Sequence, residues 1–457
     1  MLDPATGELI AEVSRSGEAD VNRAIAAAER ALPEWRARPA AERAAVLRRF
    51  TMLLGRHEDE LAELLTREQG KPLSESRGEI RYGASFTDFY AEEARRIYGE
   101  TIPAPDASSR IVVMRQAIGI GAGITPWNFP SAMITRKLAP ALAAGCTFVL
   151  KPAEATPLSA LILAGLLEQA GAPKGVFNVV PGAREDSASI GKVLCADSRV
   201  RALSFTGSTA VGKILLAQCA ATIKKVGLEL GGNAPFIVFD DADLEQAVNG
   251  CMVAKFRNAG QTCVAANRIL VHAKVYEKFR DALAKRISEL RVGPGLEEGV
   301  TTGPLIDEAA AKKVEEHLAD ARDKGATITL GGARHERGGS FFQPTLVESA
   351  SPDMRLAREE TFGPVAALTK FSSEEEAIQI ANDTHAGLAA YFYARDIGRV
   401  WRVSEALEYG MVGVNTGLVS TVVAPFGGVK ESGLGREGSR HGIDEWTDLK
   451  YVRMAGL

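Results

Sequence analysis

Two short segments hold the residues best suited to nucleophilic chemistry. One places the thiol of Cys263 at the end of the small, polar, turn-forming stretch FRNAGQTC, and the other places Glu229 before Leu-Gly-Gly. A thiol attacks only as the thiolate, so Cys263 needs surroundings that lower its pKa or a neighbouring group that accepts its proton. None of the six histidines lies close to Cys263 in the sequence. Glu229 is therefore the better candidate for the base, which indicates chemistry other than that of a Cys/His protease.

The other four cysteines are expected to be structural. Cys146, Cys195, Cys219 and Cys251 lie among Ala, Leu and Val, where a cysteine usually packs as a small hydrophobic residue. The chain has five cysteines, an odd number, and no C-x-x-C pair. Neither a disulfide framework nor a zinc site is indicated, and no metal site is predicted.

Two segments that follow expected strands could hold a dinucleotide. Ser204–Gly212 (SFTGSTAVG) leads from a strand into a helix, where backbone N–H groups and the helix dipole can hold a phosphate. An ordinary strand-turn-helix corner would look the same. Lys151 and Glu154 end another strand and could bind a ribose, or form a solvated surface pair. Because a carboxylate accepts hydrogen bonds from ribose hydroxyls and repels a 2′-phosphate, Glu154 favours NAD over NADP.

Two more segments carry groups that could act on a substrate or cofactor. Ile124–Pro130 (ITPWNFP) brackets Asn128 between two prolines. An amide held in this way is a suitable oxyanion donor, worth roughly 3–4 kcal/mol to a transition state; the alternative is a Pro-rich turn with an Asx hydrogen bond. Glu359–Pro364 (EETFGP) could set a carboxylate beside a sugar hydroxyl and a ring beside a planar base, or be an acidic helix end before a Gly-Pro turn.

The elements that must position these residues follow an α/β pattern. From about Asp20 to Tyr98, apolar residues recur at helical spacing among Arg and Glu, which predicts a helical layer. From Ile118 onward, short apolar runs alternate with amphipathic helices, which is typical of a parallel sheet covered on both faces. A second alternating stretch runs from about Ala234 to Asn415, and Leu449–Arg453 is a possible edge strand. The cleft between the two α/β parts is the default site.

Composition narrows the classes of function. Of the 457 residues, 46% are hydrophobic and 25% are charged, with a formal charge of −4, which is typical of a globular protein with two or more cores. Lys and Arg are spread along the chain, so no nucleic-acid partner is expected. The apolar run near Ala139–Leu150 is too short and too interrupted by glycine to span a membrane, and no signal peptide is recognised. We therefore expect a cytoplasmic protein without a membrane partner.

Together and in this order, the chemistry-bearing segments resemble the aldehyde dehydrogenase superfamily over essentially the whole chain. Stretches that resemble its succinate-semialdehyde dehydrogenase branch are 131–137 (SAMITRK), 255–258 (KFRN), 389–393 (AAYFY) and 432–438 (SGLGREG). The resemblance implies an α/β aldehyde dehydrogenase fold with a Rossmann-like cofactor domain, a catalytic α/β domain and a small β oligomerisation segment. The expected boundaries are 1–98 and 118–231 for the NAD-binding domain, 232–430 for the catalytic domain, and 99–117 and 431–457 for the oligomerisation segment.

The resemblance also assigns catalytic roles. Cys263 attacks the aldehyde to give a thiohemiacetal, whose oxyanion is held by the side-chain amide of Asn128 and the backbone N–H of Cys263. Hydride transfer to the nicotinamide leaves a thioester, and Glu229 activates the water that hydrolyses it. Lys137 matches a family lysine near the catalytic asparagine, although a helix-surface lysine would look the same in the sequence.

By the same resemblance the cofactor is NAD, and the substrate is a small semialdehyde with a distal carboxylate. The residues expected to bind the cofactor are Thr125, Pro126, Trp127, Lys151, Pro152, Ala153, Glu154, Gly207, Ser208, Thr209, Gly212, Leu230, Glu360 and Phe362. Arg136 and Arg257 match two arginines that hold the carboxylate of succinate semialdehyde, a role that suits the planar guanidinium. Ser420 would add a hydroxyl donor. The alternative for each arginine is a structural salt bridge.

Several alternatives and departures accompany this interpretation. Glutarate semialdehyde is one methylene longer, a difference of only about 1–3 kcal/mol in a pocket, and a broad-specificity aldehyde dehydrogenase or an esterase side activity is also open. Ala265 stands where many members of the branch carry a second cysteine, so no local disulfide switch is expected. The chain begins within what is normally a longer N-terminal region, so a short β-segment there is expected to be absent. Exposed strand edges usually need a partner, which supports a homo-oligomer, either dimer or tetramer.

Overall fold

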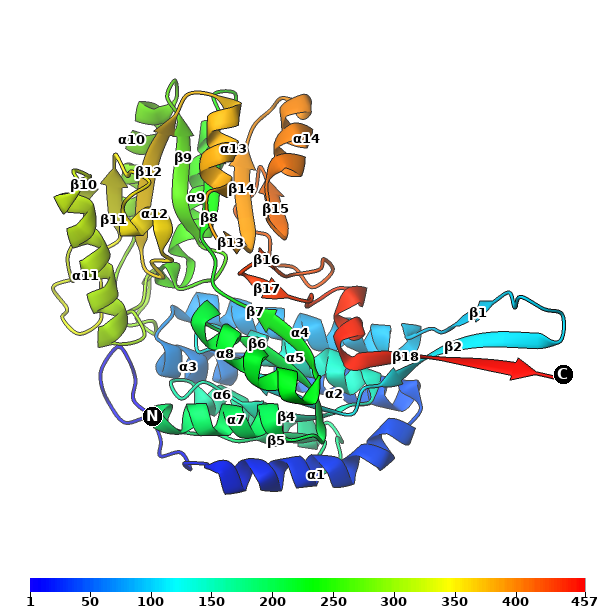
Figure 1. Ribbon diagram of the computed structural model, residues 1–457. Helices are drawn as coiled ribbons and strands as arrows, with labels where there is room; N and C mark the ends of the chain where they lie inside the picture. Colours follow the sequence, from blue (N-terminus) through cyan, green and yellow to red (C-terminus); the bar gives the residue numbers. More distant parts are fainter. Residues whose placement is uncertain (457) are drawn as a thin grey trace.

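The first α/β part is built on a six-stranded sheet in the order β17-β7-β6-β3-β4-β5. The computed structural model describes residues 1–456 and is drawn in Figure 1. The strands of this sheet are β3 (Ile120–Ile124), β4 (Thr147–Lys151), β5 (Phe177–Val179), β6 (Val200–Thr206), β7 (Lys225–Glu229) and β17 (Gly433–Leu434). All neighbours run parallel except β17, which comes from the C-terminal tail and pairs Gly433 with Glu229 in antiparallel register.

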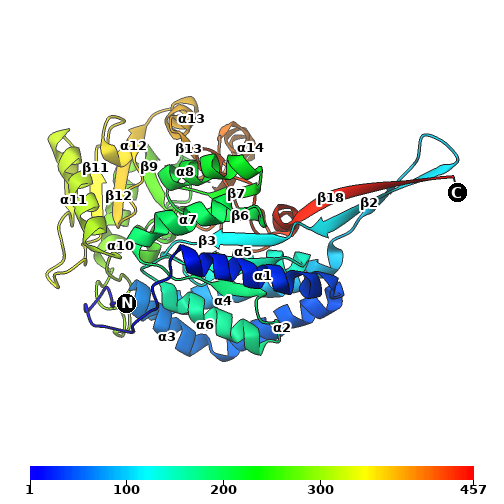
Figure 2. The same ribbon diagram turned by 60° about the horizontal axis from the view of Figure 1, so that its bottom comes forward.

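Helices cover both faces of this sheet, as the alternating pattern predicted (Figure 2). They are α1 (Glu18–Ala37), α2 (Ala40–Arg56), α3 (Glu58–Gln69), α4 (Leu73–Glu93), α5 (Ala132–Ala144), α6 (Pro157–Gln169), α7 (Ser187–Ala196) and α8 (Thr209–Cys219). The helical layer predicted for 20–98 is confirmed as α1 to α4. Because apolar residues at three- and four-residue spacing share one face of a helix, these helices bury that face against the sheet and against one another.

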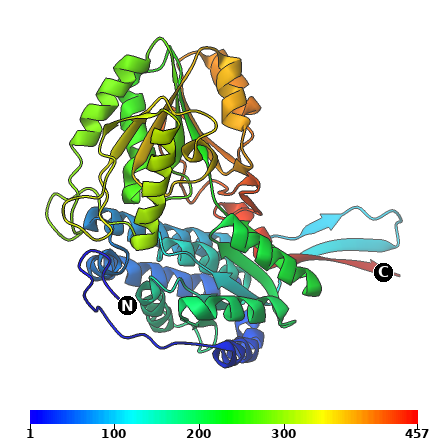
Figure 3. The same ribbon diagram turned by 60° about the vertical axis from the view of Figure 1, so that its left-hand side comes forward.

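The second α/β part carries a seven-stranded sheet in the order β10-β11-β12-β9-β8-β14-β15, stacked above the first part in Figures 1 and 3. Its strands are β8 (Ala234–Val238), β9 (Ala266–His272), β10 (Thr327–Leu330), β11 (Thr345–Glu348), β12 (Val365–Phe371), β14 (Ala389–Tyr393) and β15 (Met411–Val414). Its helices are α9 (Leu244–Phe256), α10 (Tyr276–Ser288), α11 (Glu308–Asp323), α12 (Arg355–Arg358), α13 (Glu374–Asn382) and α14 (Ile397–Ala406). Apart from the antiparallel β10–β11 pair, these strands run parallel.

A three-stranded ribbon projects from the body (Figures 1 and 2). It consists of β1 (Glu100–Ile102), β2 (Ser109–Ala117) and β18 (Thr447–Ala455), in the order β1-β2-β18. The strand predicted for 449–453 is confirmed, and it is an edge strand. A short pair, β13 (Ala386–Gly387) with β16 (Val429–Lys430), links the tail to the second part. Within the described part of the chain, no helix has the length and apolar character needed to cross a bilayer.

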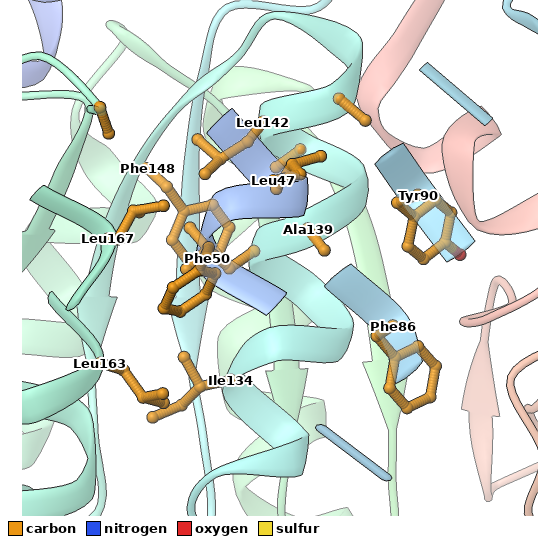
Figure 4. Packing of buried hydrophobic residues seen from close by; sticks show 14 of the residues in the cluster. Leu47, Phe50, Phe86, Tyr90, Ile134, Ala139, Leu142, Phe148, Leu163 and Leu167 are labelled. Carbon is orange, nitrogen blue, oxygen red and sulfur yellow. The ribbon is translucent and has the colours of Figure 1, made fainter. Parts of the chain in front are cut away.

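Helix α5 runs through the interior of the first part. All 13 of its residues are buried, and Figure 4 shows Phe50 of α2 and Leu163 of α6 on one side of the helix and Phe86 of α4 on the other. A helix that is apolar on all sides belongs in a core. It ends at Gly145, whose φ of 97° is the left-handed conformation that favours glycine at a helix C-terminus. Any charged side chain on α5 is therefore buried and needs a partner.

Candidate active site

The two α/β parts meet at a cleft, which is lined by segments that lie far apart in the sequence. The first part contributes the loop after β3 and the turn after β6, and the second contributes the segments around Cys263 and Glu360. Ligands of parallel sheets bind at the carboxyl ends of the strands, which explains why these loops converge. Among the predicted site residues, those that line this cleft are Pro126, Trp127, Asn128, Gly207, Ser208, Leu230, Cys263, Glu360 and Phe362.

A strained turn leads to Cys263. Asn258, Ala259 and Gly260 all have positive φ, at 52°, 53° and 75°. A residue other than glycine pays about 1–3 kcal/mol for this conformation and keeps it only where its surroundings enforce it. Here the backbone N–H of Asn258 donates to Glu75 at 2.8 Å, and Gln261 fixes the far end with side-chain hydrogen bonds to the carbonyls of Asn258 and Pro304. The turn delivers Cys263 to the cleft in a fixed direction.

The thiol of Cys263 is protonated in this environment. Burial raises its pKa to about 12, the nearby carboxyls of Glu360 and Glu229 act in the same direction, and Arg136 and Arg257 oppose the rise. A thiolate forms only if a base accepts the proton as the electrophile arrives. The site therefore depends on a nearby proton acceptor.

Glu229 has the properties of such an acceptor. It ends β7, is buried, and neither carboxylate oxygen has a hydrogen-bond partner among residues 1–456. Burial raises the pKa of Glu229 well above its usual value, Glu437 raises it further, and Arg136 and Lys137 oppose the rise. A carboxyl with a raised pKa is a stronger base once ionised. Its side chain lines a small compartment with Lys137 and Glu437, while its neighbour Leu230 lines the Cys263 cleft, so Glu229 must turn toward Cys263 to act there.

Hydrogen bonds fix both the side-chain amide and the backbone carbonyl of Asn128. Its Nδ2 donates to the backbone carbonyl of Gln261 at 3.0 Å, and its own backbone carbonyl accepts hydrogen bonds from Lys71 at 2.7 Å and from Asn258 at 3.0 Å. A side-chain amide has two N–H donors, so one remains for a ligand in the cleft. The geometry suits an oxyanion donor.

Lys137 is buried rather than on a helix surface, because α5 runs through the core. Its ammonium donates to Glu437 and, at 2.9 Å, to the hydroxyl of Ser204. The carboxylate of Glu437 also accepts a hydrogen bond from the Nε of Arg136 at 2.5 Å. Burial alone would raise the pKa of Glu437, but Lys137 and Arg136 outweigh it and lower the pKa to about 2. The sequence did not predict a role for Glu437. The only signal was its position in the Gly-rich stretch 432–438 (SGLGREG).

The two arginines predicted to bind a carboxylate keep unsatisfied donors. The Nη2 of Arg136 and the Nε of Arg257 are buried without a hydrogen-bond partner in residues 1–456. Arg136 lies over the ring of Phe426 at 3.8 Å and Arg257 over that of Phe129 at 5.4 Å. A buried charged donor without a partner is costly, so an anionic group would find complementary sites here. Ser420 is half-buried on the loop after β15.

The residues predicted to bind a dinucleotide occupy the ends of β3, β4 and β6. A side chain at Gly207 would collide with the ring of Phe205, and one at Gly212 with Leu230, at 2.4 and 2.5 Å. The N–H groups at the start of α8 are thus left open, with Ser208 as the N-cap, and such a turn fits a phosphate. Thr209 lines an adjoining cavity that also includes Ser208 and Glu360.

The predicted ribose-binding pair lies outside the Cys263 cleft. Lys151 is buried and its ammonium donates to Glu154 at 3.2 Å, while the Glu154 side chain is 39% exposed. Thr125 joins the loops after β3 and β4 through a backbone hydrogen bond to Lys151. Pro152 and Ala153 between them are buried as well, so Glu154 is the exposed residue of this stretch at the end of β4.

Glu360 and Phe362 reach the cleft from the second part. Glu360 accepts a hydrogen bond from the backbone N–H of Gly232 at 3.1 Å, and burial raises its pKa to about 7. Phe362 has a φ of 55° and meets Trp127 edge to face at 5.6 Å. The paired rings and the carboxylate form a wall next to Cys263 that suits a planar ring and a sugar.

Comparison with known proteins agrees with the resemblance found in the sequence. Residues 1–452 match the aldehyde dehydrogenase family. The chain is 58% identical to the 3-sulfolactaldehyde dehydrogenase of Pseudomonas putida, covering 100% of this chain and 93% of that protein. It is also 58% identical to the NADP(+) succinate-semialdehyde dehydrogenase of Escherichia coli K12 (99% and 93%), and 57% identical to the glutarate-semialdehyde dehydrogenase of Pseudomonas aeruginosa (100% and 94%).

Solved structures give the same result for the fold. The crystal structure of succinate-semialdehyde dehydrogenase from Burkholderia pseudomallei superposes with a TM-score of 0.98 at 59% sequence identity, covering 99% of this chain and 94% of that one. A betaine aldehyde dehydrogenase from Staphylococcus aureus, solved in complex with NAD+, superposes with a TM-score of 0.97 at 36% identity, covering 100% and 91%. Both the α/β parts and the projecting ribbon thus belong to a known architecture.

Proposed function

Since the chain belongs to the aldehyde dehydrogenase family, with the fold of that family, we propose that it oxidises succinate semialdehyde to succinate through Cys263. The observation that carries the choice of substrate is the pair of arginines, the buried Arg136 and the half-buried Arg257, each of which has a buried, unsatisfied N–H group near the reactive thiol. A dinucleotide, when bound, accepts the hydride. The chain's own groups must bind the aldehyde, hold the oxyanion and move the protons.

Cys263 forms the covalent intermediates in this proposal. Its sulfur attacks the aldehyde carbon while Glu229, turned toward the cleft, takes up the thiol proton, and the resulting oxyanion accepts hydrogen bonds from the free N–H of Asn128 and the backbone N–H of Cys263. Loss of hydride from the same carbon gives a thioester. After that proton has passed to solvent, Glu229 removes a proton from water, which attacks the thioester carbon, and the leaving sulfur takes this proton back from Glu229 as the acid and the Cys263 thiol are released.

Lys137 acts through charge and position in this scheme. Its ammonium is bound to Glu437 and Ser204, next to Glu229. A positive charge there favours the ionised form of Glu229 and so restrains the rise in its pKa that burial causes. The buried Lys137–Glu437–Arg136 group also fixes one edge of Arg136, which leaves its Nη2 as the donor for a substrate carboxylate.

The distal group of the substrate is proposed to be a carboxylate. The relatives named above are named for succinate semialdehyde, glutarate semialdehyde and 3-sulfolactaldehyde. The names of the first two substrates imply a distal carboxylate, and that of the third implies a sulfonate. Glutarate semialdehyde is the nearest competitor because one methylene changes binding by only about 1–3 kcal/mol.

We propose NAD as the preferred cofactor, on the charge of Glu154. Burial raises its pKa, but backbone hydrogen bonds and Lys151 outweigh this and lower it below its usual value, so the carboxylate is ionised at neutral pH and would repel a 2′-phosphate. The Escherichia coli relative is named for NADP(+), which makes the test a direct one. Replacing Glu154 with serine should raise the ratio of kcat/KM for NADP to that for NAD by about 10- to 30-fold. A phosphate monoester carries about 1.5–2 negative charges at neutral pH, and a carboxylate about 4 Å away repels each unit of charge by about 1 kcal/mol in water. An unchanged ratio would show that Glu154 does not determine the preference between NAD and NADP.

The substrate assignment is tested with initial rates for succinate semialdehyde, glutarate semialdehyde and an uncharged aldehyde of similar length. Loss of a charge-assisted hydrogen bond costs about 1.5–3 kcal/mol, so Arg257→Ala should lower kcat/KM for the two acidic substrates by about 10- to 150-fold. The uncharged aldehyde should be nearly unaffected. Arg286→Ala is the matched control, because Arg286 is an exposed arginine on α10 paired with Glu289. Equal loss on all three aldehydes would contradict the carboxylate-binding role.

We propose further that the chain is a homo-oligomer, dimer or tetramer, joined through the ribbon, with the domain boundaries expected from the sequence. The ribbon leaves β1 and β18 as free edges in the single chain, and on β18 the side chains of Leu449 and Tyr451 are 66% and 67% exposed. Apolar side chains on an open edge favour pairing with another strand. Light scattering should give a multiple of 48.7 kDa, and Leu449→Lys/Tyr451→Lys should lower it. A wild-type protein that remains a single chain would refute this.

A further inference from the structure

A buried ion pair lies behind Asn128, on the side away from the cleft. Lys71 Nζ lies 2.6 Å from Glu79 Oε2, and both side chains are fully buried. The same ammonium donates to the backbone carbonyl of Asn128 at 2.7 Å and lies over the ring of Phe129 at 3.9 Å. An ammonium has three N–H donors and no acceptor, so each of these groups accounts for one. Lys71 is thus committed to the Asn128 segment.

The other oxygen of Glu79 holds the start of α5. Its Oε1 accepts hydrogen bonds from the backbone N–H groups of Ser131 at 2.9 Å and Ala132 at 3.2 Å. A carboxylate there also interacts favourably with the helix dipole. One ion pair therefore fixes the peptide both at Asn128 and three residues later, where α5 begins.

A second carboxyl on the same helix holds the turn before Cys263. Glu75 lies one turn before Glu79 on α4, and its Oε2 accepts the backbone N–H of Asn258 at 2.8 Å. Asn258 in turn donates its side-chain amide to the carbonyl of Asn128 at 3.0 Å. The first two turns of α4 thus contact both segments that the reaction needs, although none of their residues lines the cleft.

We infer that Lys71, Glu75 and Glu79 form a positioning unit, which aims the free amide N–H of Asn128 at the point beside the backbone N–H of Cys263 where the oxyanion forms. This inference rests on the proposed function. An apolar replacement of similar shape often serves as well as a buried ion pair in a core. Here the pair also supplies a donor to a buried carbonyl and acceptors to two backbone N–H groups, none of which an apolar side chain can replace.

The test uses a variant that removes both charges with little change in shape, Lys71→Met/Glu79→Gln, alone and combined with Asn128→Ala. A misplacement of about 1 Å can cost about 10²-fold in rate, and loss of one oxyanion donor about 10²–10³-fold. We expect kcat to fall about 100-fold in the wild-type background, with the Kd of the dinucleotide changed less than about threefold. In the Asn128→Ala background the same change should cost less than about threefold, because the group that it positions is gone.

Two further measurements separate this role from a purely structural one. Glu68→Gln is the matched control: Glu68 is also a buried carboxylate that accepts the first N–H groups of a helix, those of Leu158 and Ser159 at the start of α6, at 2.9 and 3.0 Å. The variant Glu68→Gln should lower the melting temperature without changing kcat. If Lys71→Met/Glu79→Gln does not fold, Glu75→Ala, which removes only the acceptor for Asn258, takes its place and should show the same dependence on Asn128.

The hydrolysis of p-nitrophenyl acetate gives a second readout that needs neither the dinucleotide nor a particular aldehyde. It uses the Cys263 thiol and the same oxyanion contacts. A wild-type protein that cleaves the ester but oxidises no aldehyde would contradict the proposed function while leaving the positioning test intact. Rates in either assay that are unchanged, or that fall by the same factor with and without Asn128, would refute the positioning role of Lys71, Glu75 and Glu79.

Discussion

The substitution Glu437→Gln removes the negative charge that the buried Arg136 and Lys137 side chains share. The pKa of this carboxyl is lowered from 4.5 to about 2 in the folded protein, which corresponds to roughly 3 kcal/mol at about 1.36 kcal/mol per pKa unit. Breaking a buried ion pair by removing one partner costs about 3–5 kcal/mol. The free energy from the pKa shift and the usual cost of breaking a buried ion pair are similar. The variant should therefore lose about 3 to 4 kcal/mol of unfolding free energy at neutral pH.

The change in melting temperature follows from the size of the unit that unfolds. With an unfolding entropy of about 2.1 cal/mol/K per residue, 3 kcal/mol lowers Tm by about 3 °C if the whole chain unfolds together, and by about 7 °C if a part of about 200 residues unfolds alone. Differential scanning fluorimetry measures this shift directly. Glu297→Gln is the control, because its pair with Arg337 is exposed and such pairs contribute at most about 1 kcal/mol.

The pH dependence gives the sign of the effect. Because the folded pKa of Glu437 lies below the unfolded value, its contribution is fully present above about pH 4.5 and is lost as the pH falls toward 2. The difference in stability between wild type and Glu437→Gln should therefore be constant from pH 5 to 7 and shrink below pH 4.5. A difference that is absent at pH 7, or that stays the same at pH 3, would refute the ion-pair argument.

Three other predictions follow from the site. Glu229→Gln should slow both the first release of NADH and steady-state turnover by about 10²–10⁴-fold, measured by stopped-flow absorbance; full turnover would exclude Glu229 as the base. Because the pKa of Cys263 is about 12, its alkylation by iodoacetamide should still accelerate as the pH rises from 7 to 10, and a plateau at neutral pH would contradict the protonated thiol. The pKa of Glu360 is about 7, and ribose hydroxyls bind the ionised form, so dinucleotide affinity should rise with pH across 7 in titration calorimetry and lose this dependence in Glu360→Gln; the same pH dependence in the variant would assign it to another group.

The local patterns in the sequence predicted the elements well, and the reason is physical. Helical spacing in 20–98 and the β-runs from Ile118 onward depend on neighbours within a few residues, so each can be recognised without knowledge of the fold. The segments around Asn128, Cys263 and Glu360 could be placed in one cleft because loops at the carboxyl ends of parallel strands converge.

The charged groups behind the site could not be found in this way. Lys137 pairs with a residue 300 positions later, and its burial follows from the central place of α5, which local spacing does not reveal. Lys71 was missed for the same reason, because its partner Asn128 lies 57 positions away. Glu229 was predicted as a base, but its orientation toward Glu437 depends on the C-terminal tail, which reaches the first sheet only in the folded chain.

The position of α5 also limits how the enzyme can change during evolution or engineering. Arg136 projects from a helix whose every residue is buried, so a substitution there disturbs the core as well as the proposed contact with the substrate, and most replacements will be lost to instability before their selectivity can be tested. The loop at 415–424 and the segment at 306–310 contain exposed and half-buried residues and tolerate change far better. Mutant libraries aimed at longer, branched or uncharged aldehydes should therefore vary these two loops and leave α5 intact.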